Sequence, residues 1–395
     1  MSRFRLEMSY LHVALGCSVV ACSSDEIGAR GAPTTSSSAG AAAGCSHGGG
    51  TNGRDANASE SSGGGGSAAL PDAASEASLS DDVALGPPPD FGPNVLVFDA
   101  SMPMATIQSQ IDAVRDKQRG YPAHEFADTR YAYFFKPGQY RLDVWVEYYM
   151  QVLGLGALPD DVTITGAVRS KPDNGTIALV NFWRAVENLA VIPTEDDNVE
   201  VWAVSQGTSL RRAHVKGAIH LSDQNGWSSG GFIADTKIDD VIDSGTQQQF
   251  FTRNTDLSTW RDGNFNHYAL AFVGDVGAPA MNWPRVSYSV VDKTPVIREK
   301  PYLYIDKDGN YFVRVPVLKT DSQGPSWSGS TIPAGRSITT GRFHVAKPGV
   351  DSAATLNAAL AQGKHLLFTP GIYPRVSLSG GGVNATARKG VWSVS

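Results

Sequence analysis

The chain has 395 residues, of which 41% are hydrophobic and 18% charged, so it can bury a substantial core. Its 33 basic and 39 acidic residues are interspersed and give a net charge of −6, which makes nucleic acid an unexpected partner. The three cysteines, Cys17, Cys22 and Cys45, all precede residue 90, which excludes disulfide bonds and cysteine-ligated metal from the rest of the chain.

The first 22 residues have the pattern of a bacterial secretory signal. Arg3 and Arg5 precede an apolar stretch, residues 11–21, that is too short to span a bilayer. The stretch ends in Val-Val-Ala-Cys, which resembles the lipobox of bacterial lipoproteins, where the cysteine, here Cys22, is acylated and becomes the mature N-terminus. An ordinary signal peptide cleaved nearby is the alternative. Both interpretations place the rest of the chain outside the cytoplasm.

Residues 23–90 contain mostly Gly, Ala, Ser, Asp and Pro and almost no large apolar side chain. Such a segment cannot bury enough apolar surface to offset the entropy lost on ordering. We therefore expect a disordered tether between a membrane anchor at Cys22 and a folded body that begins near residue 91.

The body is predicted to be all-β. Residues 106–118 have an amphipathic helical pattern and residues 352–363 partly repeat it, whereas the remainder consists of short β-rich pieces. Four of these pieces recur at separations of 24, 23 and 19 residues, centred on Val191, Val215, Ile238 and Leu257. One coil of a right-handed parallel β-helix needs about that much chain, and stacked coils align their inward apolar residues. Coincidental spacing in another β fold is the alternative.

A longer repeat predicts that a second helix begins near residue 341. Residues 105–144 and 354–376 both contain a short helix, an apolar strand and a Pro-Gly-x-Tyr turn, which ends at Tyr140 and at Tyr373. We therefore expect the first β-helix domain over residues 91–340. Residues 341–395 are expected to form the start of a second, shortened helix.

Polar side chains recur at the spacing of the coils. Gln206 precedes Ser229 by 23 residues, and Ser229 precedes Gln248 by 19. Stacked coils would place these neutral side chains on one stripe, where amides and a hydroxyl offer both donors and acceptors. The stripe would suit a held water molecule or the hydroxyl groups of a sugar.

Three segments around these residues resemble glycoside hydrolase family 55, the exo-acting β-1,3-glucanases built from two tandem right-handed β-helices. The segments are WAVSQGTSLRR (202–212), NGWSSGGF (225–232) and TQQQFFTRN (246–254), and they occur in the family's order. The resemblance extends from about Val95 to the end of the chain. It implies a pectin-lyase-like parallel β-helix that acts on β-1,3-glucan.

The same resemblance implies an inverting mechanism, in which a carboxylic acid protonates the leaving oxygen while a held water attacks from the opposite face. Carried over to this chain, the water is held by Gln206, Ser229 and Gln248, with Gln249 as a further candidate. The family's acid is a glutamate of the second helix, but residues 374–395 contain neither Asp nor Glu. The chain is therefore expected to carry an incomplete active site.

Five residues near these segments are candidate sugar contacts, namely Trp227, Asp235, Gln249, Arg253 and Asn254. Trp227 stands beside Ser229 and would stack on a sugar ring. Asp235 belongs to an aspartate-rich stretch that would either bind a ligand or cap backbone amides at a turn. Arg253 and Asn254 would likewise either cap a turn or contact the ligand.

The sequence gives no signal for a cofactor. His214, His220 and His267 share no metal-ligand spacing. The stretch LGLGALPDD (153–161) lacks the third glycine and the following helix of a nucleotide-binding loop. We therefore expect neither a metal ion nor an organic cofactor.

Hydrolysis of extracellular β-1,3-glucan by a surface-anchored or secreted protein accounts best for these patterns. A non-catalytic glycan-binding or adhesin-like protein would keep the polar stripe and the tryptophans without needing an acid. A polysaccharide lyase of the pectin-lyase-like group would need a Brønsted base and usually calcium or a basic residue beside a uronate, whereas the predicted stripe is neutral.

Overall fold

The structure is a computed structural model whose described residues all belong to one unit, Glu76–Ser395. The described ranges are 85–172, 177–224, 226–261, 269–281, 288–373 and 391–393. The predicted signal sequence with Cys22, the predicted tether up to residue 84, and residues 374–390 lie outside these ranges.

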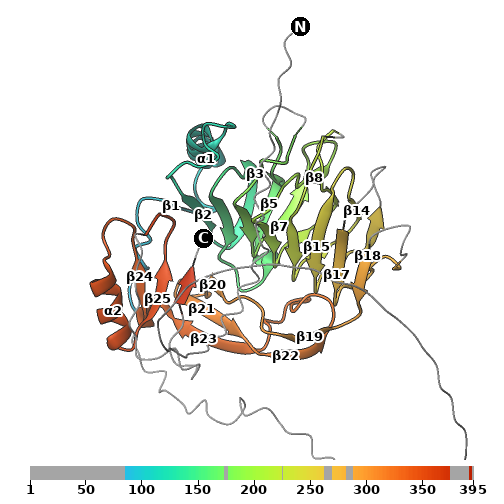
Figure 1. The fold of residues 1–395 in the computed structure, drawn as a ribbon. Coiled ribbons are helices and arrows are strands. Elements are labelled where there is room, and N and C mark those ends of the chain that lie inside the picture. The colour runs from blue at the N-terminus through green and yellow to red at the C-terminus, as the bar shows by residue number, and fades with distance from the viewer. Residues whose placement is uncertain are drawn as a thin grey trace, which may run out of the picture. The chain divides into compact units, whose positions relative to one another are not determined.

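Most strands of the described ranges stack into a parallel β-helix with three sheets, which confirms the predicted fold (Figure 1). Within these ranges and in spatial order, the first sheet has nine strands: β1 (Val95–Phe98), β2 (Tyr131–Phe135), β4 (Met150–Gly154), β6 (Arg184–Glu187), β9 (Thr208–Arg211), β12 (Phe232–Ala234), β15 (Gln249–Arg253), β17 (Ala269–Val273) and β18 (Tyr288–Val291). The second has β13 (Lys237–Ile238), β10 (His214–Val215), β7 (Ala190–Pro193), β5 (Val162–Arg169) and β3 (Gly138–Trp145). The third has β16 (Thr259–Arg261), β14 (Val241–Asp243), β11 (Ala218–His220) and β8 (Val199–Val201). A short 3₁₀ turn, η1 (Pro159–Asp161), precedes β5.

The apolar repeat of the sequence forms one inward column of the second sheet. Val191 pairs with Val215, and Val215 pairs with Ile238, in parallel register. A parallel bridge one residue earlier places Leu257 on the next rung. All four side chains are at most 2% exposed and belong to the main core. The predicted coil spacing is thus confirmed, because each coil brings an apolar residue to the same inward position.

Helix α1 (Met104–Gln118) confirms the first predicted helix and packs its apolar face on the main core. The Pro-Gly-x-Tyr turn after β2 is fixed by Tyr140, whose hydroxyl lies 2.8 Å from the carbonyl oxygen of Lys136 and 3.3 Å from that of Phe98. The tyrosine therefore ties the end of β1 to the end of β2.

The same unit recurs after residue 340, as the repeat predicts. It follows the turn η2 (Thr340–Arg342) and consists of β24 (Phe343–Ala346), α2 (Ala353–Ala361), β25 (His365–Phe368) and the adjacent strand β26 (Val391–Ser393). The hydroxyl of Tyr373 lies 2.7 Å from the carbonyl oxygen of Ala346 and 3.1 Å from that of Thr369. These contacts match those of Tyr140, so the two copies share one local structure.

Residues 294–339, which we call the arm, form antiparallel strands, although the sequence analysis assigned them to the first β-helix. The arm contains β19 (Thr294–Ile297) paired with β22 (Lys319–Ser322), and a sheet of β20 (Tyr302–Ile305), β21 (Tyr311–Pro316) and β23 (Gly335–Thr339). An Asp308-Gly309 turn joins β20 to β21, which is a typical hairpin signal. A second core forms where the arm meets the outer face of the first rungs, with Phe134 and Leu153 beside Leu303.

In four rungs of the first sheet, the residue directly after the strand has a left-handed backbone conformation. These residues, which we call the turn ladder, follow β6, β9, β12 and β15 directly; they are Asn188, Arg212, Asp235 and Asn254, with φ of 57°, 47°, 52° and 50°. Residues other than glycine rarely hold this conformation unless side-chain contacts support it. The turn ladder therefore needs partners for its polar side chains.

Asn188 finds these partners in the preceding rung. Its Nδ2 donates to the carbonyl oxygens of Gly154, at 2.9 Å, and Gly156, at 2.8 Å. A Cβ atom on Gly154 would lie 1.9 Å from the carbonyl oxygen of Asn188, so only glycine fits there. The two glycines of LGLG thus serve the packing of adjacent rungs.

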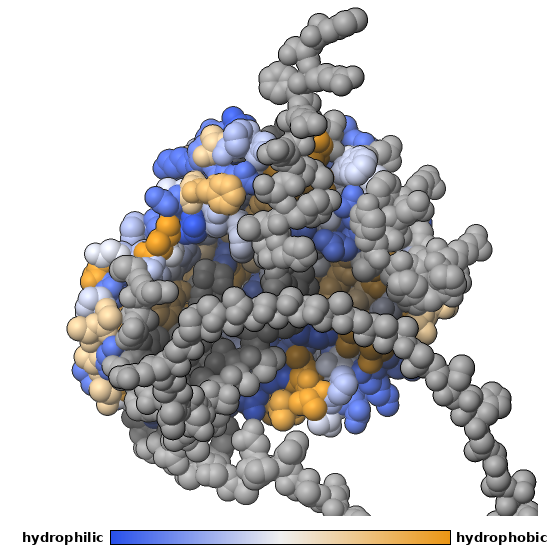
Figure 2. Space-filling view, viewed as in Figure 1, coloured by the Kyte–Doolittle hydropathy of each residue, from blue (hydrophilic) through white to orange (hydrophobic). Residues whose placement is uncertain are grey.

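On the face shown in Figure 2, hydrophilic residues are interspersed with scattered hydrophobic ones, and a small hydrophobic group lies near β22. Val317 and Leu318, in the turn between β21 and β22, are each 41% exposed. Within the described ranges, no helix has both the length and the apolar character needed to cross a membrane.

One carboxyl group is buried in the third sheet. Glu200 of β8 is 2% exposed, and its Oε2 accepts a hydrogen bond from the backbone N–H of Val168 at 3.3 Å. Burial raises the pKa of Glu200 from 4.5 to about 8, and the hydrogen bond and Arg169 only partly oppose this shift. Near neutral pH the folded protein therefore holds a proton that the unfolded chain has released.

We expect the free energy of unfolding to fall as the pH rises from about 5 to about 8, because the proton on Glu200 favours the folded state only below its folded pKa. At about 1.4 kcal/mol per pKa unit, the loss amounts to several kcal/mol. Urea unfolding across this pH range should show a flatter profile for Glu200→Gln than for the wild type. Glu195→Gln, at an exposed carboxylate of the preceding turn, is the control. Identical pH profiles for all three proteins would contradict the assignment.

Candidate functional site

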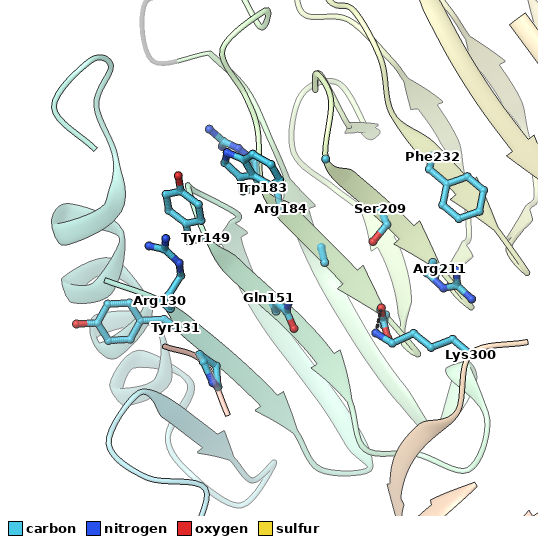
Figure 3. Close-up of a pocket in the computed structure, with 14 residues that line it drawn as sticks. Arg130, Tyr131, Tyr149, Gln151, Trp183, Arg184, Ser209, Arg211, Phe232 and Lys300 are labelled. Atoms are coloured by element: carbon cyan, nitrogen blue, oxygen red, sulfur yellow. Dashed lines mark hydrogen bonds and ion pairs between the residues drawn. The ribbon is translucent and has the colours of Figure 1, made fainter. Parts of the chain in front are cut away.

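A groove of about 540 Å³ lies on the outer face of the first sheet (Figure 3). Its walls come from β2, β4, β6, β9 and β12, from the residues just before these strands, from the arm, and from Pro370 after β25. Parallel strands stay in register and alternate residues share a face, so equivalent residues of successive rungs form columns. Three such columns line the groove.

The first column is aromatic. The rings of Tyr149 and Trp183 stack with their centroids 6.2 Å apart and their planes 9° apart. The guanidinium group of Arg130 lies 3.5 Å from the centre of the Tyr149 ring, at cation–π distance. On the rung after Trp183, Gly207 lines the groove without a side chain. Trp183 is 50% exposed, so the column offers an accessible indole.

The middle column forms the floor of the groove. Gln151 pairs with Ala185, and Ala185 pairs with Ser209. The register of the next pair of strands places Phe232 on the following rung, where its ring stacks on Phe251 at 5.2 Å. The floor therefore changes along the sheet from small and polar residues to a pair of phenyl rings.

The third column is charged and ties the arm to the sheet. Glu187 accepts from Lys300 of the arm at 2.6 Å. One oxygen of Glu299 lies 2.7 Å from Arg253 and 3.3 Å from Arg211. Burial raises the pKa of Glu299, an effect that the two guanidinium groups reduce. Arg253, a predicted sugar contact, therefore holds the arm in place through Glu299.

Asp235, another predicted sugar contact, is a buried anchor for the arm. Its carboxylate accepts hydrogen bonds from the backbone N–H of Ser326 and from the Ser326 hydroxyl, the latter at 2.9 Å. Its carbonyl oxygen accepts from the indole N–H of Trp327 at 2.7 Å. Burial raises the pKa of Asp235, and the guanidinium of Arg212, 3.5 Å away, opposes this shift. These contacts support the turn-capping alternative.

Asn254 has a similar environment and is 2% exposed. Its Nδ2 donates to the carbonyl oxygen of Gly324 at 3.2 Å and to the hydroxyl of Ser322 at 3.0 Å. Its Oδ1 accepts from the hydroxyl of Thr294 at 2.6 Å. Like Asp235, this residue uses its polar atoms to hold the arm beside the turn ladder.

Gln206 and Ser229 are linked through Ser205 beside the groove. Ser205 pairs with Ser229 across the rungs, and its hydroxyl lies 2.6 Å from both the Gln206 Oε1 and the Ser229 carbonyl oxygen. Gln206 is exposed and immediately precedes Gly207, which lines the groove. A Cβ atom on Gly230 would lie 3.1 Å from the Gln206 Cγ, so that glycine makes room for the amide.

The three adjacent glutamines have different environments. Gln247 is fully buried; its Oε1 accepts from the backbone N–H of Gly230 at 2.9 Å, and its Nε2 lies 3.3 Å from the carbonyl oxygen of Leu221. Gln248 is half-buried and lies on the rung next to Ser229. Gln249 donates from Nε2 to the Ser229 hydroxyl at 3.3 Å. We call Gln206, Ser229 and Gln249 the amide–hydroxyl cluster.

Trp227 is 50% exposed and forms a parallel bridge with Ile177, outside the set of residues that line the groove. The aromatic wall instead comes from Tyr149 and Trp183, which the sequence analysis did not single out. Their separation of 34 residues exceeds the coil spacing, because the chain makes an excursion before β6. The only sequence signal for this aromatic wall was an aromatic residue just before each of two predicted strands.

Comparison with known proteins finds a related glucanase. No family model matches the chain. Over 289 residues, or 72% of its length, it is 46% identical to an exo-beta-1,3-glucanase of Streptomyces sp. (strain SirexAA-E / ActE), and the match covers 45% of that enzyme. The structure of sacteLam55A from Streptomyces sp. SirexAA-E matches with a TM-score of 0.67 at 44% identity, over 72% of this chain and 50% of that chain. A glutamate-to-alanine variant of sacteLam55A in complex with glucose matches equally well.

This chain is a relative of the family 55 β-1,3-glucanases. It spans about half the length of the relatives that it matches. Among the described residues of this chain, no group of three or more His, Cys, Asp or Glu side chains is placed to hold a metal ion. The groove presents aromatic rings, amides, hydroxyls and ion pairs to a ligand.

The different roles of adjacent glutamines give a direct test. We expect Gln247→Met to lower the free energy of unfolding by about 2–4 kcal/mol, because it removes a fully buried amide that hydrogen-bonds to the N–H of Gly230 and to the carbonyl oxygen of Leu221. Gln248→Met, one residue along, should change it by less than about 1 kcal/mol, since the Gln248 side chain is partly exposed. Equal losses in a urea titration would show that the buried amide has been assigned to the wrong glutamine.

Proposed function

We propose that the protein hydrolyses β-1,3-glucan from its chain ends, with the sugar chain in the groove and the attacking water at the amide–hydroxyl cluster. The observation that carries this proposal is the position of Gln206, which directly precedes Gly207 against the indole of Trp183 and is linked to Ser229 through the Ser205 hydroxyl. The relationship to an exo-beta-1,3-glucanase, and to a structure with bound glucose, supports the choice of substrate.

The cluster has the chemistry to hold a water molecule. Because the Ser229 hydroxyl accepts from Gln249, its own proton remains available for donation to another acceptor. Gln206 is exposed, so its amide offers a donor and an acceptor to solvent beside the groove. A water held by such groups keeps a fixed orientation toward the anomeric carbon, which favours an in-line attack.

The acid is proposed to come from outside this cluster. An inverting hydrolase needs a protonated carboxyl group across the sugar ring from the water. Glu187 and Glu299 stand closest to the groove among the carboxylates described above, but Lys300 and two arginines already pair with them. The resemblance assigns this acid to a glutamate of the second helix, and residues 341–395 of this sequence contain none.

These ion pairs also favour a second candidate function. A glycan-binding protein needs the aromatic wall and the polar floor, but it needs no acid. Binding of β-1,3-glucan without release of glucose would support this alternative. An unsaturated product from a polyuronate would support the lyase alternative instead.

We expect the chain, once joined to a second helix that supplies this glutamate, to release glucose from laminarin, with the α-anomer appearing first in a proton NMR time course, because inversion at a β-linkage gives the α-product. Gln206→Ala and Ser229→Ala should each lower kcat by about a hundredfold while leaving laminarin binding in place, because they remove groups that hold the water. Glu195→Gln, on the turn between β7 and β8, is the matched control. Initial formation of the β-anomer, or full activity in both alanine variants, would contradict the mechanism.

We also propose that the protein acts outside the cytoplasm as a lipoprotein anchored at Cys22. The lipobox-like sequence and the Gly- and Ser-rich residues that follow it support this location. In a bacterial host, the full chain should incorporate labelled palmitate and sediment with membranes, and Cys22→Ala should abolish both. Labelling that persists in Cys22→Ala, or its absence from the wild type, would contradict the anchor.

A further inference from the structure

Ser205 joins two members of the amide–hydroxyl cluster through one hydroxyl group. This hydroxyl lies 2.6 Å from the carboxamide of Gln206 and 2.6 Å from the carbonyl oxygen of Ser229. Two polar atoms approach to 2.6 Å only when a hydrogen atom lies between them. A serine hydroxyl carries a single hydrogen, so it can donate fully to only one of these two neighbours. The placement of the hydrogens therefore decides how the Gln206 amide is turned.

The hydrogen of Ser205 is needed at the Ser229 carbonyl oxygen. A carbonyl oxygen has no hydrogen of its own, so the hydroxyl at 2.6 Å must donate to it. The two ends of a carboxamide have the same shape, and hydrogen bonding determines which end faces a neighbour. With Oε1 of Gln206 facing Ser205, one hydrogen would have to serve both contacts. With Nε2 there, each contact has its own hydrogen, so counting hydrogens places Nε2 against Ser205.

The backbone of Ser205 is fixed firmly enough to impose this orientation. The residue is 1% exposed, its N–H donates to the Asn181 carbonyl oxygen at 3.1 Å, and its carbonyl oxygen accepts from the Thr208 hydroxyl at 2.9 Å. Asn181 is itself buried and donates from Nδ2 to the carbonyl oxygen of Ala203 at 2.8 Å. Buried partners on both sides therefore hold the Ser205 hydroxyl in one place.

The stem of Gln206 is also held, although the residue is exposed. Gly230 has a φ of 103°, and a Cβ atom there would lie 3.1 Å from Cγ and 3.2 Å from the backbone nitrogen of Gln206. The glutamine thus packs closely on bare backbone, and rotation of its terminal amide is the main freedom that remains. A hydrogen bond from Nε2 to Ser205 removes this freedom and leaves Oε1 as the end that can accept from solvent.

The orientation of the amide decides whether a water held at the cluster can act as a nucleophile. The Ser229 hydroxyl accepts from Gln249 at 3.3 Å and so offers its own hydrogen to the water. If Gln206 presented Nε2 as well, both groups would donate to the water and occupy both of its lone pairs. With Oε1 presented, the water donates one hydrogen to Gln206 and keeps a lone pair for the anomeric carbon.

We propose that Ser205 is a positioning residue, which holds the Gln206 amide with Nε2 toward the buried hydroxyl and Oε1 toward the attacking water. The proposal deepens the proposed function and rests on it for the role of the water. The orientation of the amide rests only on the contacts of Ser205, and it can be measured without any substrate.

NMR spectra of the full chain with 15N-labelled glutamine test the orientation. The Gln206 side-chain signals are identified by their loss in Gln206→Glu. We expect one Nε2 hydrogen of Gln206 to exchange with water about tenfold more slowly than those of the exposed Gln110 of α1, because it is hydrogen-bonded. This protection should vanish in Ser205→Ala and remain in Ser205→Thr.

Ser228→Ala is the matched control for these spectra. Ser228 is a fully buried serine of the neighbouring rung, and its hydroxyl has no hydrogen-bond partner among the described residues. Removing this hydroxyl should leave the exchange of the Gln206 hydrogens unchanged. If Ser205→Ala does not fold, Ser205→Cys replaces it with the same expectation, because a thiol is a weaker hydrogen-bond partner than a hydroxyl.

The effect on hydrolysis is measured in the chain joined to a second helix, as for the proposed function. Ser205→Ala should lower kcat on laminarin by about tenfold with little change in KM, because the water loses its fixed orientation while the sugar keeps its contacts. Ser205→Thr should recover most of this loss, and Ser228→Ala should leave kcat unchanged.

The remaining outcomes overturn distinct claims. Fast exchange of both Gln206 hydrogens in the wild type, or protection that persists in Ser205→Ala, overturns the orientation. Wild-type kcat in Ser205→Ala, together with a large loss in Gln206→Ala, overturns the positioning role and leaves the proposed function standing. If the joined wild type releases no glucose, the proposed function fails and the positioning role with it, whereas the spectra still decide the orientation.

Discussion

The hydrogen-bonded register of the nine parallel strands is the constraint on which the rest of the structure depends. A rung spacing of about 4.8 Å places residues that are two dozen positions apart in the chain within contact distance. The parallel register of the second sheet aligns Val191, Val215 and Ile238 in one inward apolar column. On the outer face of the first sheet, the register aligns an aromatic, a polar and a charged column, and these columns are the groove. A slip of one residue in any coil would exchange the two faces and destroy both arrangements.

The turn ladder helps to form the groove, because two of its residues hold the arm that completes the groove wall. Two of these left-handed residues, Asp235 and Asn254, turn their polar side chains toward the arm and hold it through hydrogen bonds to Ser326 and Gly324. The arm in turn brings Glu299 and Lys300 to the groove. Asp235 and Asn254, which the sequence analysis gives as candidate sugar contacts, therefore act indirectly, through the arm. Their role is to position the segment that completes the wall.

The sequence was most informative where a local pattern repeats at the period of a coil. The apolar column, the two helices and the paired Pro-Gly-x-Tyr turns at Tyr140 and Tyr373 could all be predicted for that reason. The assignment of individual glutamines could not, because adjacent residues of a strand point to opposite faces and only the coordinates show which face Gln247 occupies. Trp183 escaped prediction because an excursion of the chain breaks the coil spacing before β6. The arm escaped it because antiparallel hairpins and short coil strands have similar composition.

The central claim is that separate rungs converge on one sugar-binding groove on the outer face of the first sheet. A crystal structure of the full-length Ser229→Ala protein with laminaritriose tests it most directly. The account predicts a sugar chain along that face, between the aromatic column and the charged column, with one ring beside Gln206. A trisaccharide bound on another face of the protein would contradict it.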